Sequence, residues 1–329
     1  MVTDFQAEEN FYKKKYHFSY SGLNKLLFSP RSFYNHYILN QREDKMEQHL
    51  IEGTLLHCLL LEEDKFNEKF VLSPNKLPGD SAKKVLDKVF TRALIDGYTE
   101  LSLEDLSNDI IMVLQEINLH QSLKTDEQRV EKMITEENKS YYDFLRTKGD
   151  KLVIDNETLD KVKISVDEVK GNSKAWSLLG IGNPDTKSEV PLQTDLLNYN
   201  FGLKGIVDNI RVAHDEKTIY INDLKTTGKM IQDFPETVEY YKYWLQAAVY
   251  CKLVRANNQE LNPELSDYKI KFHFVVVDKI NQCYAFEVSK VTLNKWLDDL
   301  DDVLKIAAYH YDSRNYDLPY MYKEGNVIL

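Results

Sequence analysis

Cysteine, glycine and proline are scarce in this chain of 329 residues, which contains 3 Cys, 12 Gly and 8 Pro. So little glycine and proline excludes collagen-like and low-complexity chains, and 43% hydrophobic residues suffice for a large core. The cysteines, Cys58, Cys251 and Cys283, form no CxxC pair and cannot all be joined in disulfides. They are too few for a four-cysteine zinc or iron–sulfur site within this chain. We therefore expect reduced thiols and a cytoplasmic protein.

Long apolar runs are also missing. No segment reaches the roughly 20 apolar residues of a membrane-spanning helix, and the N-terminal segment MVTDFQAEENFYKKKY lacks the apolar part of a secretory signal. We expect no membrane association. The formal net charge of −11 argues against unselective coating of nucleic acid, but it is compatible with a locally basic groove.

The period of the hydrophobic pattern changes near residue 180. The first 18 residues, polar and then basic, predict a flexible N-terminal arm. Helical spacing follows at 19–37, with a break at Ser29-Pro30, at 52–61, and repeatedly within 81–179. Beyond Gly180 the pattern predicts strands at 188–194, 203–213, 217–225, 268–277 and 282–288. Two further helices are predicted at 235–256 and 292–309, the second with Thr292 as its N-cap.

This order of elements predicts an α/β or α+β fold. We expect a mixed central sheet flanked by helices, with a large helical elaboration before the sheet. Residues 19–329 are expected to form a single domain in which residues 81–179 are a helical insertion.

Two of the predicted strands end in acidic residues. Gly205-Ile206-Val207-Asp208 ends one, and Asp223-Leu224-Lys225 ends the next. Side chains alternate along a strand, so Asp223 and Lys225 point the same way and can converge with Asp208 at the sheet edge. Carboxylates suit Mg²⁺, and a lysine can orient an attacking water, so the pattern indicates metal-assisted phosphodiester hydrolysis. The alternative is a solvent-facing Asp208 and a chance acid-x-lysine triplet.

Glu189, His57, Gln246 and Tyr250 each allow two interpretations. Glu189, one strand before Asp208, is either a solvated strand residue or a further acid near the metal. His57, inside an apolar helix, is either a core residue or a ligand, and imidazole suits Mn²⁺ better than Mg²⁺. Gln246 and Tyr250 share one face of a helix. Gln246 is either a boundary residue or a contact to a phosphate or the metal-bound water, with Tyr250 packing alongside it or donating to DNA.

Ser29 and Arg31 lie at the predicted start of a short helix. A hydroxyl, a guanidinium and a helix N-terminus together suit a DNA phosphate. The alternative is an exposed arginine at a helix start.

In their order along the chain, these motifs resemble the PD-(D/E)XK nuclease superfamily, and more narrowly the RecE (exonuclease VIII) type of phage and prophage recombination exonucleases. The resemblance is carried by SYSGLNKLLFSPRSFY, the Gly-Thr-x-x-His helix of Gly53–Glu62, Glu189, Gly205–Asp208, Asp223-Leu224-Lys225 and Gln246-x-x-x-Tyr250. Val207 stands where proline often precedes the first acid of the family. The scattered cysteines do not match the iron–sulfur branch.

The resemblance implies a restriction-endonuclease-like core and a role for each motif. Asp208, Asp223, the carbonyl of Leu224 and His57 would ligate Mg²⁺ or Mn²⁺, and Lys225 would position the attacking water. The catalytic set that it implies is Glu189, Asp208, Asp223, Lys225, Gln246 and Tyr250.

The implied activity is 5′→3′ exonucleolytic digestion of double-stranded DNA ends, which leaves single-stranded tails for recombination. The implied partners are DNA ends, a single-strand annealing protein and further copies of the chain in a ring, in the cytoplasm of a bacterial or phage-infected cell. Two alternatives remain. One is another nuclease of the superfamily, acting on single strands or in a repair or defence complex. The other is a non-catalytic DNA-binding protein of the same fold.

Overall fold

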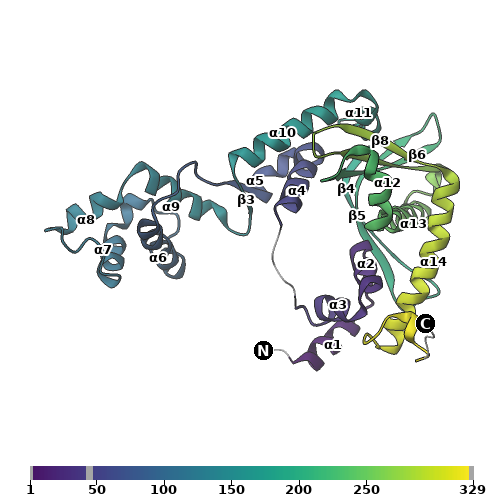
Figure 1. The fold of residues 1–329 in the computed structure, drawn as a ribbon, viewed down its shortest axis with the longest axis horizontal. Helices are drawn as coiled ribbons and strands as arrows, with labels where there is room; N and C mark the ends of the chain where they lie inside the picture. The colour runs from purple at the N-terminus through teal and green to yellow at the C-terminus, as the bar shows by residue number, and fades with distance from the viewer. Residues whose placement is uncertain (1–2, 42–46, 326–329) are drawn as a thin grey trace. The chain divides into compact units, whose positions relative to one another are not determined.

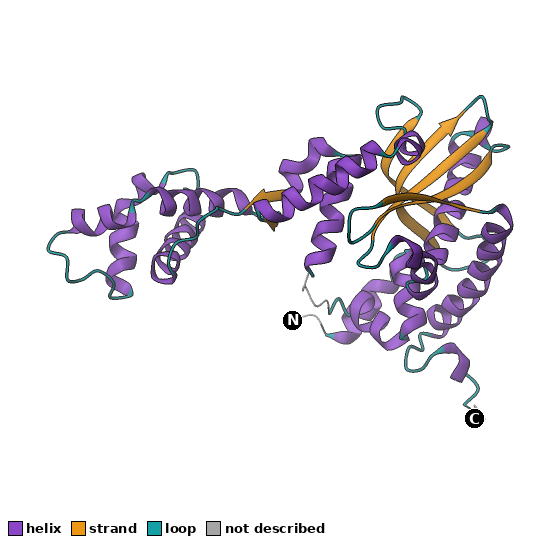
Figure 2. Ribbon diagram, turned by 45° about the horizontal axis from the view of Figure 1, so that its top comes forward, coloured by secondary structure: helices purple, strands orange, loops and turns teal. Residues whose placement is uncertain are grey.

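The computed structural model describes residues 3–41 and 47–325. The chain folds into two compact units. The first unit comprises Met1–Glu47, Leu60–Glu62 and Ile164–Leu329, and the second comprises Gln48–Leu59 and Glu63–Lys163. The large sheet belongs to the first unit, and the second is mainly helical (Figures 1 and 2). Within the described residues, no helix combines the length and the apolar character needed to cross a membrane.

A mixed sheet forms the centre of the first unit. Over the described residues its strands are β1 (His17–Phe18), β4 (Thr186–Asp195), β5 (Gly202–Ala213), β6 (Thr218–Thr226), β7 (Lys269–Val277) and β8 (Cys283–Val288). β4, β5 and β6 pair antiparallel, β6 and β7 pair parallel, and β7 and β8 pair antiparallel. The predicted mixed sheet is confirmed. The short β1, which pairs parallel with the start of β5, was not predicted.

Helices cover both faces of this sheet. The helices of the first unit are α1 (Asp4–Tyr12), α2 (Tyr20–Phe28), α3 (Pro30–Phe33), the π-helix η1 (Tyr34–Ile38), α11 (Ser173–Leu179), α12 (Phe234–Tyr240), α13 (Tyr243–Leu261) and α14 (Lys290–Ser313). Short 3₁₀ turns occur at η4 (Ile231–Asp233), η5 (Pro263–Leu265) and η6 (Tyr320–Tyr322). The main core contains apolar residues of α2, α13 and α14 together with Ile221, Phe272 and Phe274 of the sheet.

A buried pair of asparagines anchors α11 to the sheet. Asn209 and Asn222 are register partners in β5 and β6, and neither is exposed. Asn222 Nδ2 donates to Asn209 Oδ1 (2.7 Å) and to the carbonyl of Leu178 (2.8 Å), while Asn209 Nδ2 donates to the carbonyl of Leu179 (2.9 Å). The last carbonyls of α11, which lack partners within the helix, are therefore satisfied by the sheet. Because side chains alternate along a strand, Asn222 and the core residue Ile221 mark opposite faces.

The structure differs from the sequence predictions at two helix boundaries. The helix predicted at 235–256 is divided into α12 and α13, because Lys242 between them has φ +54° and ψ +42°, in the left-handed region. The N-cap of α14 is Ser289, and the prediction of Thr292 is wrong. Ser289 is extended, and its Oγ accepts a hydrogen bond from the N–H of Thr292 (3.1 Å), which lies within the first turn.

The segment predicted as a loosely held arm contains α1. Thr3 caps this helix with a capping box, in which its side chain accepts from the N–H of Gln6. The rings of Phe11 and Tyr12 lie 6.3 Å and 5.1 Å from that of Tyr311 in α14. This aromatic packing gives the segment a place on the first unit that its polar composition did not indicate.

The second unit has a helical core of its own. It contains most of α4 (Gln48–Leu61), η2 (Glu63–Lys65), α5 (Phe66–Lys69), β2 (Phe70–Leu72), α6 (Asp80–Asp96), η3 (Leu103–Leu106), α7 (Ser107–Glu116), α8 (Asp126–Met133), α9 (Glu136–Lys148), β3 (Leu152–Ile154) and the first half of α10 (Asn156–Gly171). Val89 of α6, Ile110 of α7 and Tyr142 of α9 are fully buried in its core. It stays a prediction that residues 19–329 form one domain with a helical insertion at 81–179.

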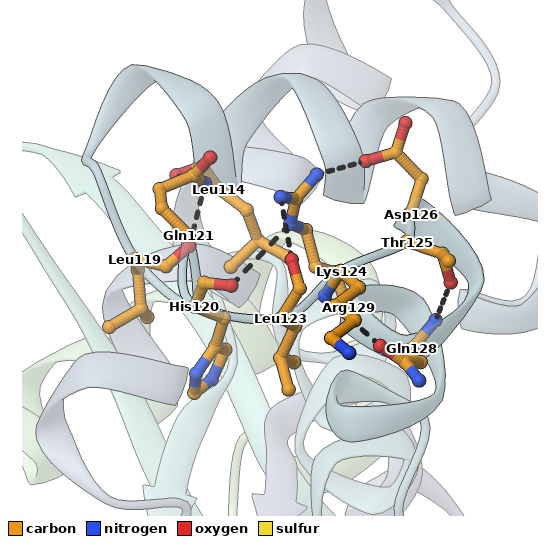
Figure 3. A network of polar contacts seen from close by, with 10 residues as sticks. All are labelled: Leu114, Leu119, His120, Gln121, Leu123, Lys124, Thr125, Asp126, Gln128 and Arg129. Carbon is orange, nitrogen blue, oxygen red and sulfur yellow. Dashed lines mark hydrogen bonds and ion pairs between the residues drawn. The ribbon is translucent and has the colours of Figure 1, made fainter.

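Side-chain bonds to backbone carbonyls hold the connection between α7 and α8 (Figure 3). Gln121 Nε2 donates to the carbonyls of Leu114 (3.1 Å) and Leu119 (2.8 Å). The Arg129 guanidinium donates to the carbonyls of His120 (3.4 Å) and Leu123 (2.9 Å) and pairs with Asp126. A loop without regular structure thereby obtains partners for its polar backbone groups.

His273 is a buried titratable group on β7. It is 2% exposed, its ring lies 5.8 Å from that of Tyr220, and its Nε2 lies 3.9 Å from a carboxylate oxygen of Glu287. Burial, together with the positive charges of Lys174, Lys271 and Arg211, lowers the pKa of His273 to about 4, although Glu287 opposes this shift. His273 is therefore neutral in the folded protein at neutral pH.

We expect acid to destabilise the fold through His273. An unfolded histidine has a pKa of about 6.5, so the unfolded chain binds the extra proton first, and stability falls as the pH drops from about 6.5 towards about 4. Between pH 7 and pH 5 this group should cost about 2 kcal/mol of unfolding free energy, measured by urea denaturation. His273→Gln should reduce that dependence, whereas His214→Gln, at an exposed histidine, should retain it. Equal pH dependence in wild type and His273→Gln would contradict the assignment.

Candidate functional site

Asp208 and Asp223 meet where the β5–β6 ladder ends. Asn209 and Asn222 are the last register partners, and the two aspartates come next along their antiparallel strands. Asp208 is 6% exposed and Asp223 is 0% exposed. Asp208 Oδ2 accepts a hydrogen bond from the N–H of Leu224 (2.9 Å), which fixes its carboxylate against β6. The two acids that the sequence singled out are thus buried side by side on neighbouring strands.

Lys225 contacts Asp223, as strand alternation predicts. Its Nζ lies 2.6 Å from Asp223 Oδ2, and its side chain is 13% exposed. Burial acts to lower the pKa of Lys225, but the negative charges of Asp223 and Asp208 outweigh that effect and raise it. The lysine is therefore charged at neutral pH and remains paired with Asp223.

Glu189 has a strained backbone beside Asp208. β4 and β5 pair in one register from Thr186 to Asp195, with the exception of Glu189, whose place in the ladder is opposite Asp208. Glu189 has φ +48°, which costs a non-glycine residue roughly 1–2 kcal/mol. One of its carboxylate oxygens lies within 4.8 Å of a carboxylate oxygen of Asp208. Strain of this kind is concentrated at functional sites.

Gln246 and Tyr250 present one face of α13 near the acids. Gln246 Nε2 donates to the hydroxyl of Tyr250 (2.9 Å), and both side chains are 7% exposed. Burial raises the pKa of Tyr250, and the charges of Asp208 and Asp223 raise it further. The Tyr250 hydroxyl is therefore neutral, and the negative charges of both carboxylates act on it.

An open cleft of about 580 Å³ borders Tyr250. Four segments line it: the start of α2, part of β4, part of β5 and Tyr250 of α13. Its lining residues are Ser19, Tyr20, Ser21, Pro191, Leu192, Gln193, Lys204, Gly205, Ile206 and Tyr250. Hydroxyls, an amide and a lysine from strands and a helix start thus surround a space of the size that ligands occupy.

Tyrosines around Lys225 were missed by the sequence analysis. The Lys225 Nζ lies 4.9 Å from the ring centroid of Tyr243, which is a cation–π arrangement. Tyr20 lies nearby: burial raises its pKa, as do Tyr243 and the charge of Asp223. The dense aromatic run Tyr240-Tyr241-Lys242-Tyr243-Trp244 was the available signal, but its spacing fits an ordinary core helix equally well.

Three further candidate residues, Ser29, Arg31 and His57, were predicted from the sequence. Ser29 Oγ caps α3 by accepting from the N–H of Ser32 (3.2 Å), and Arg31 pairs with Asp317 (3.1 Å) while its side chain is 63% exposed. Their predicted contact with phosphate stays a prediction. His57 is a partly buried residue of α4 in the second unit, and its role as a ligand also stays a prediction.

The oxygen donors of the site fit a hard divalent cation. Asp208 and Glu189 have carboxylate oxygens within 4.8 Å of each other. Asp223 adds a carboxylate on the neighbouring strand, and the N–H of Leu224 donates to Asp208. Mg²⁺ prefers such oxygen donors, and Mn²⁺ accepts the same set.

Comparison with known proteins places the chain in a family. The model of the PD-(D/E)XK nuclease superfamily matches residues 17–317. No curated protein matches the chain. Among solved structures, a crystal structure of a “putative exonuclease” from Eubacterium rectale has a TM-score of 0.47 and 12% sequence identity, and the match covers 99% of this chain and 92% of that one. The family match extends over both the helical and the strand-rich parts of the sequence.

We expect Gly205→Ala to disturb the packing of Tyr250. A Cβ at Gly205 would lie 3.0 Å from Tyr250 Cε1 and 3.2 Å from Leu253 Cδ1, so buried neighbours would have to move. The expected cost is about 1–3 kcal/mol of unfolding free energy, measured by urea denaturation. Gly228→Ala is the control, because a Cβ there meets nothing within 4 Å. Equal stability of the two variants would show that Tyr250 is not held tightly against β5.

Proposed function

Since the chain belongs to the PD-(D/E)XK nuclease superfamily, we propose that it is a divalent-metal-dependent deoxyribonuclease that digests double-stranded DNA ends in the 5′→3′ direction. The observation that carries the nuclease assignment is the contact of Lys225 with Asp223 (2.6 Å), next to the buried Asp208. This is the set of two acids and a lysine on which the family's chemistry depends. The direction of digestion rests on the resemblance of the motifs to RecE-type exonucleases.

The residues proposed to hold the ion are Asp208 and Asp223, assisted by Glu189, the carbonyl of Leu224 and His57. Mg²⁺ and Mn²⁺ both suit the carboxylates, and an imidazole would favour Mn²⁺. A divalent ion held there supplies positive charge that offsets the negative charge developing on the scissile phosphate.

Lys225 is the residue proposed to act on the attacking water. The charges of Asp223 and Asp208 keep its ammonium protonated, and the Tyr243 ring covers it at 4.9 Å. A charged donor fixed in this way can hold a water molecule and a phosphate oxygen in the orientation that in-line attack requires. Because Asp223 fixes its Nζ, Lys225 needs little reorganisation during the reaction.

Gln246 and Tyr250 are proposed to support the scissile group. Their hydrogen bond orients the Tyr250 hydroxyl, and the absence of a side chain at Gly205 allows the Tyr250 ring to pack against β5. The neutral phenol can donate a hydrogen bond to a phosphate oxygen. These two residues therefore position the substrate and need not change protonation.

The cleft beside Tyr250 is the proposed path of the DNA strand that is cut. Ser19, Ser21, Gln193 and Lys204 offer donors to phosphate oxygens along it. Ser29 and Arg31 are proposed as further phosphate contacts. Contacts to phosphates and sugars do not read the bases, so we expect little sequence specificity.

The proposed product is DNA with single-stranded tails. Such tails are substrates for recombination, and we propose a single-strand annealing protein as the partner that receives them. We also propose that copies of the chain assemble in a ring around the duplex, in the cytoplasm of a bacterial or phage-infected cell. These partners follow from the resemblance of the motifs to RecE-type exonucleases.

The activity test uses linear duplexes labelled at the 5′ or the 3′ end, incubated with Mg²⁺, Mn²⁺ or EDTA. The wild type should release a 5′ label as the earliest product, and EDTA should stop digestion. Early release of the 3′ label instead would reject the proposed direction.

We expect Asp223→Ala to lose at least about 100-fold in rate, since it removes a carboxylate that would hold the ion. The fold should persist, because Asp208 remains as a negative charge near the Lys225 ammonium and the repulsion between the two buried carboxylates is removed. Asp298→Ala, at an exposed aspartate of α14, should digest DNA at the wild-type rate. Digestion by Asp223→Ala at that rate would reject the assignment of the site.

For Lys225→Ala the expected result is a fall in kcat of about 100-fold with little change in Mn²⁺ affinity, because the ammonium acts on water and phosphate and does not ligate the ion. Mn²⁺ binding can be followed by electron paramagnetic resonance, and kcat by release of the 5′ label. Lys279→Ala, at an exposed lysine, is the control. An unchanged kcat in Lys225→Ala would remove this lysine from the mechanism.

A further inference from the structure

Three tyrosine rings lead from Lys225 towards the protein surface. Tyr243 lies over the Lys225 Nζ, with 4.9 Å to its ring centroid. The Tyr241 ring stacks on that of Tyr243 at 5.6 Å with 26° between the planes. The Tyr240 ring meets Tyr241 edge-on at 4.9 Å and 89°. We refer to Tyr240, Tyr241 and Tyr243 as the tyrosine ladder.

Exposure increases along the ladder. Tyr243 is partly buried, with its ring 6.3 Å from those of Phe234 and Phe274, whereas Tyr241 is 48% exposed and Tyr240 is 74% exposed. Single exposed aromatic residues are common and need no explanation. Here the exposed rings form one continuous series of contacts that ends at the proposed catalytic lysine, and their outward location gives them little role in the core.

A strained turn supports the ladder. Lys242 lies in the left-handed region at φ +54°, which interrupts the helix between Tyr241 and Tyr243. In an uninterrupted helix, the side chains of Tyr241 and Tyr243 would point in directions about 200° apart, because they are two residues apart and each residue turns the helix by about 100°. The carbonyl of Tyr241 also accepts hydrogen bonds from the Tyr20 hydroxyl (2.5 Å) and Asn24 Nδ2 (3.4 Å) of α2. A second helix thus holds the backbone that brings the two rings into a stack.

We propose that the tyrosine ladder binds the nucleobases of an unpaired DNA strand next to the scissile phosphate. This inference rests on the proposed nuclease function for its substrate. It adds a site for bases, whereas the acids, Lys225 and the cleft contact phosphates and sugar. Stacking of a base on an aromatic ring changes affinity about 5- to 150-fold per base and tolerates any sequence, because every base has a π-face. Bases inside a duplex are already stacked, so the ladder selects an unpaired strand or a frayed end.

The test compares two single-stranded oligodeoxynucleotides with the same phosphates, one with bases and one with abasic tetrahydrofuran residues. Affinity is measured by fluorescence anisotropy in EDTA, which prevents hydrolysis. Tyr240→Ala and Tyr241→Ala should each weaken binding of the base-containing strand about 10-fold and leave binding of the abasic strand unchanged. Tyr240→Phe and Tyr241→Phe should bind like the wild type, because they keep the ring.

Tyr284→Ala is the matched control, since this tyrosine of β8 is 52% exposed and lies outside the ladder. Unchanged affinity of both alanine variants for the base-containing strand would overturn the proposal. Equal losses on both strands would also overturn it, because the effect would then not depend on bases. If Tyr241→Ala fails to fold, Tyr240→Ala decides by itself, since its ring is mostly exposed.

The same proteins separate this inference from the proposed function. The wild type could bind the base-containing strand more tightly than the alanine variants do and yet release no nucleotides with Mg²⁺ or Mn²⁺. That result would support the stacking site and reject the nuclease function. A wild type that digests DNA, with alanine variants that bind both strands as it does, would reject the ladder alone.

Discussion

The pairing of the Lys225 ammonium with the buried carboxylate of Asp223 is the interaction on which the site depends. Two aspartates are buried next to each other, which is costly unless their charges are compensated. Lys225 supplies a positive charge at 2.6 Å, and the N–H of Leu224 supplies a hydrogen bond to Asp208. Both donors come from β6, the strand that carries Asp223. The alternation of one strand and the register between two strands therefore make the arrangement possible.

Contacts on both faces of the sheet maintain the register between β5 and β6. On one face, Asn209 and Asn222 bond to each other and to the last carbonyls of α11, directly beside the two aspartates in sequence. On the other face, the core of α13 and α14 packs against Ile221 and Phe274. A shift by one residue would bury the wrong side chains on both faces, which is why the position of the acids is strongly specified.

Strained residues border the site on two sides. Glu189 and Lys242 have φ values of +48° and +54°, although neither is glycine. The first interrupts the pairing of β4 at Asp208, and the second interrupts the helix that covers Lys225 with an aromatic ring. Such conformations persist where surrounding packing over-determines them, and here they orient a carboxylate and a stack of tyrosines. Packing in the core of the first unit offsets the free-energy costs of these two strained backbone conformations.

The sequence by itself determined the five strands β4 to β8, the mixed architecture and the common face of Asp223 and Lys225, because these depend on period and alternation along one segment. Only the tertiary structure decided the bond from Leu224 to Asp208, the contact of Tyr250 with Gly205 and the stack of tyrosines. Each of these joins residues from different elements, and the pattern within one element carries no information about its distance from another. The N-cap at Ser289 and the break at Lys242 were missed for a related reason: several nearby residues could cap or end a helix, and packing selects among them.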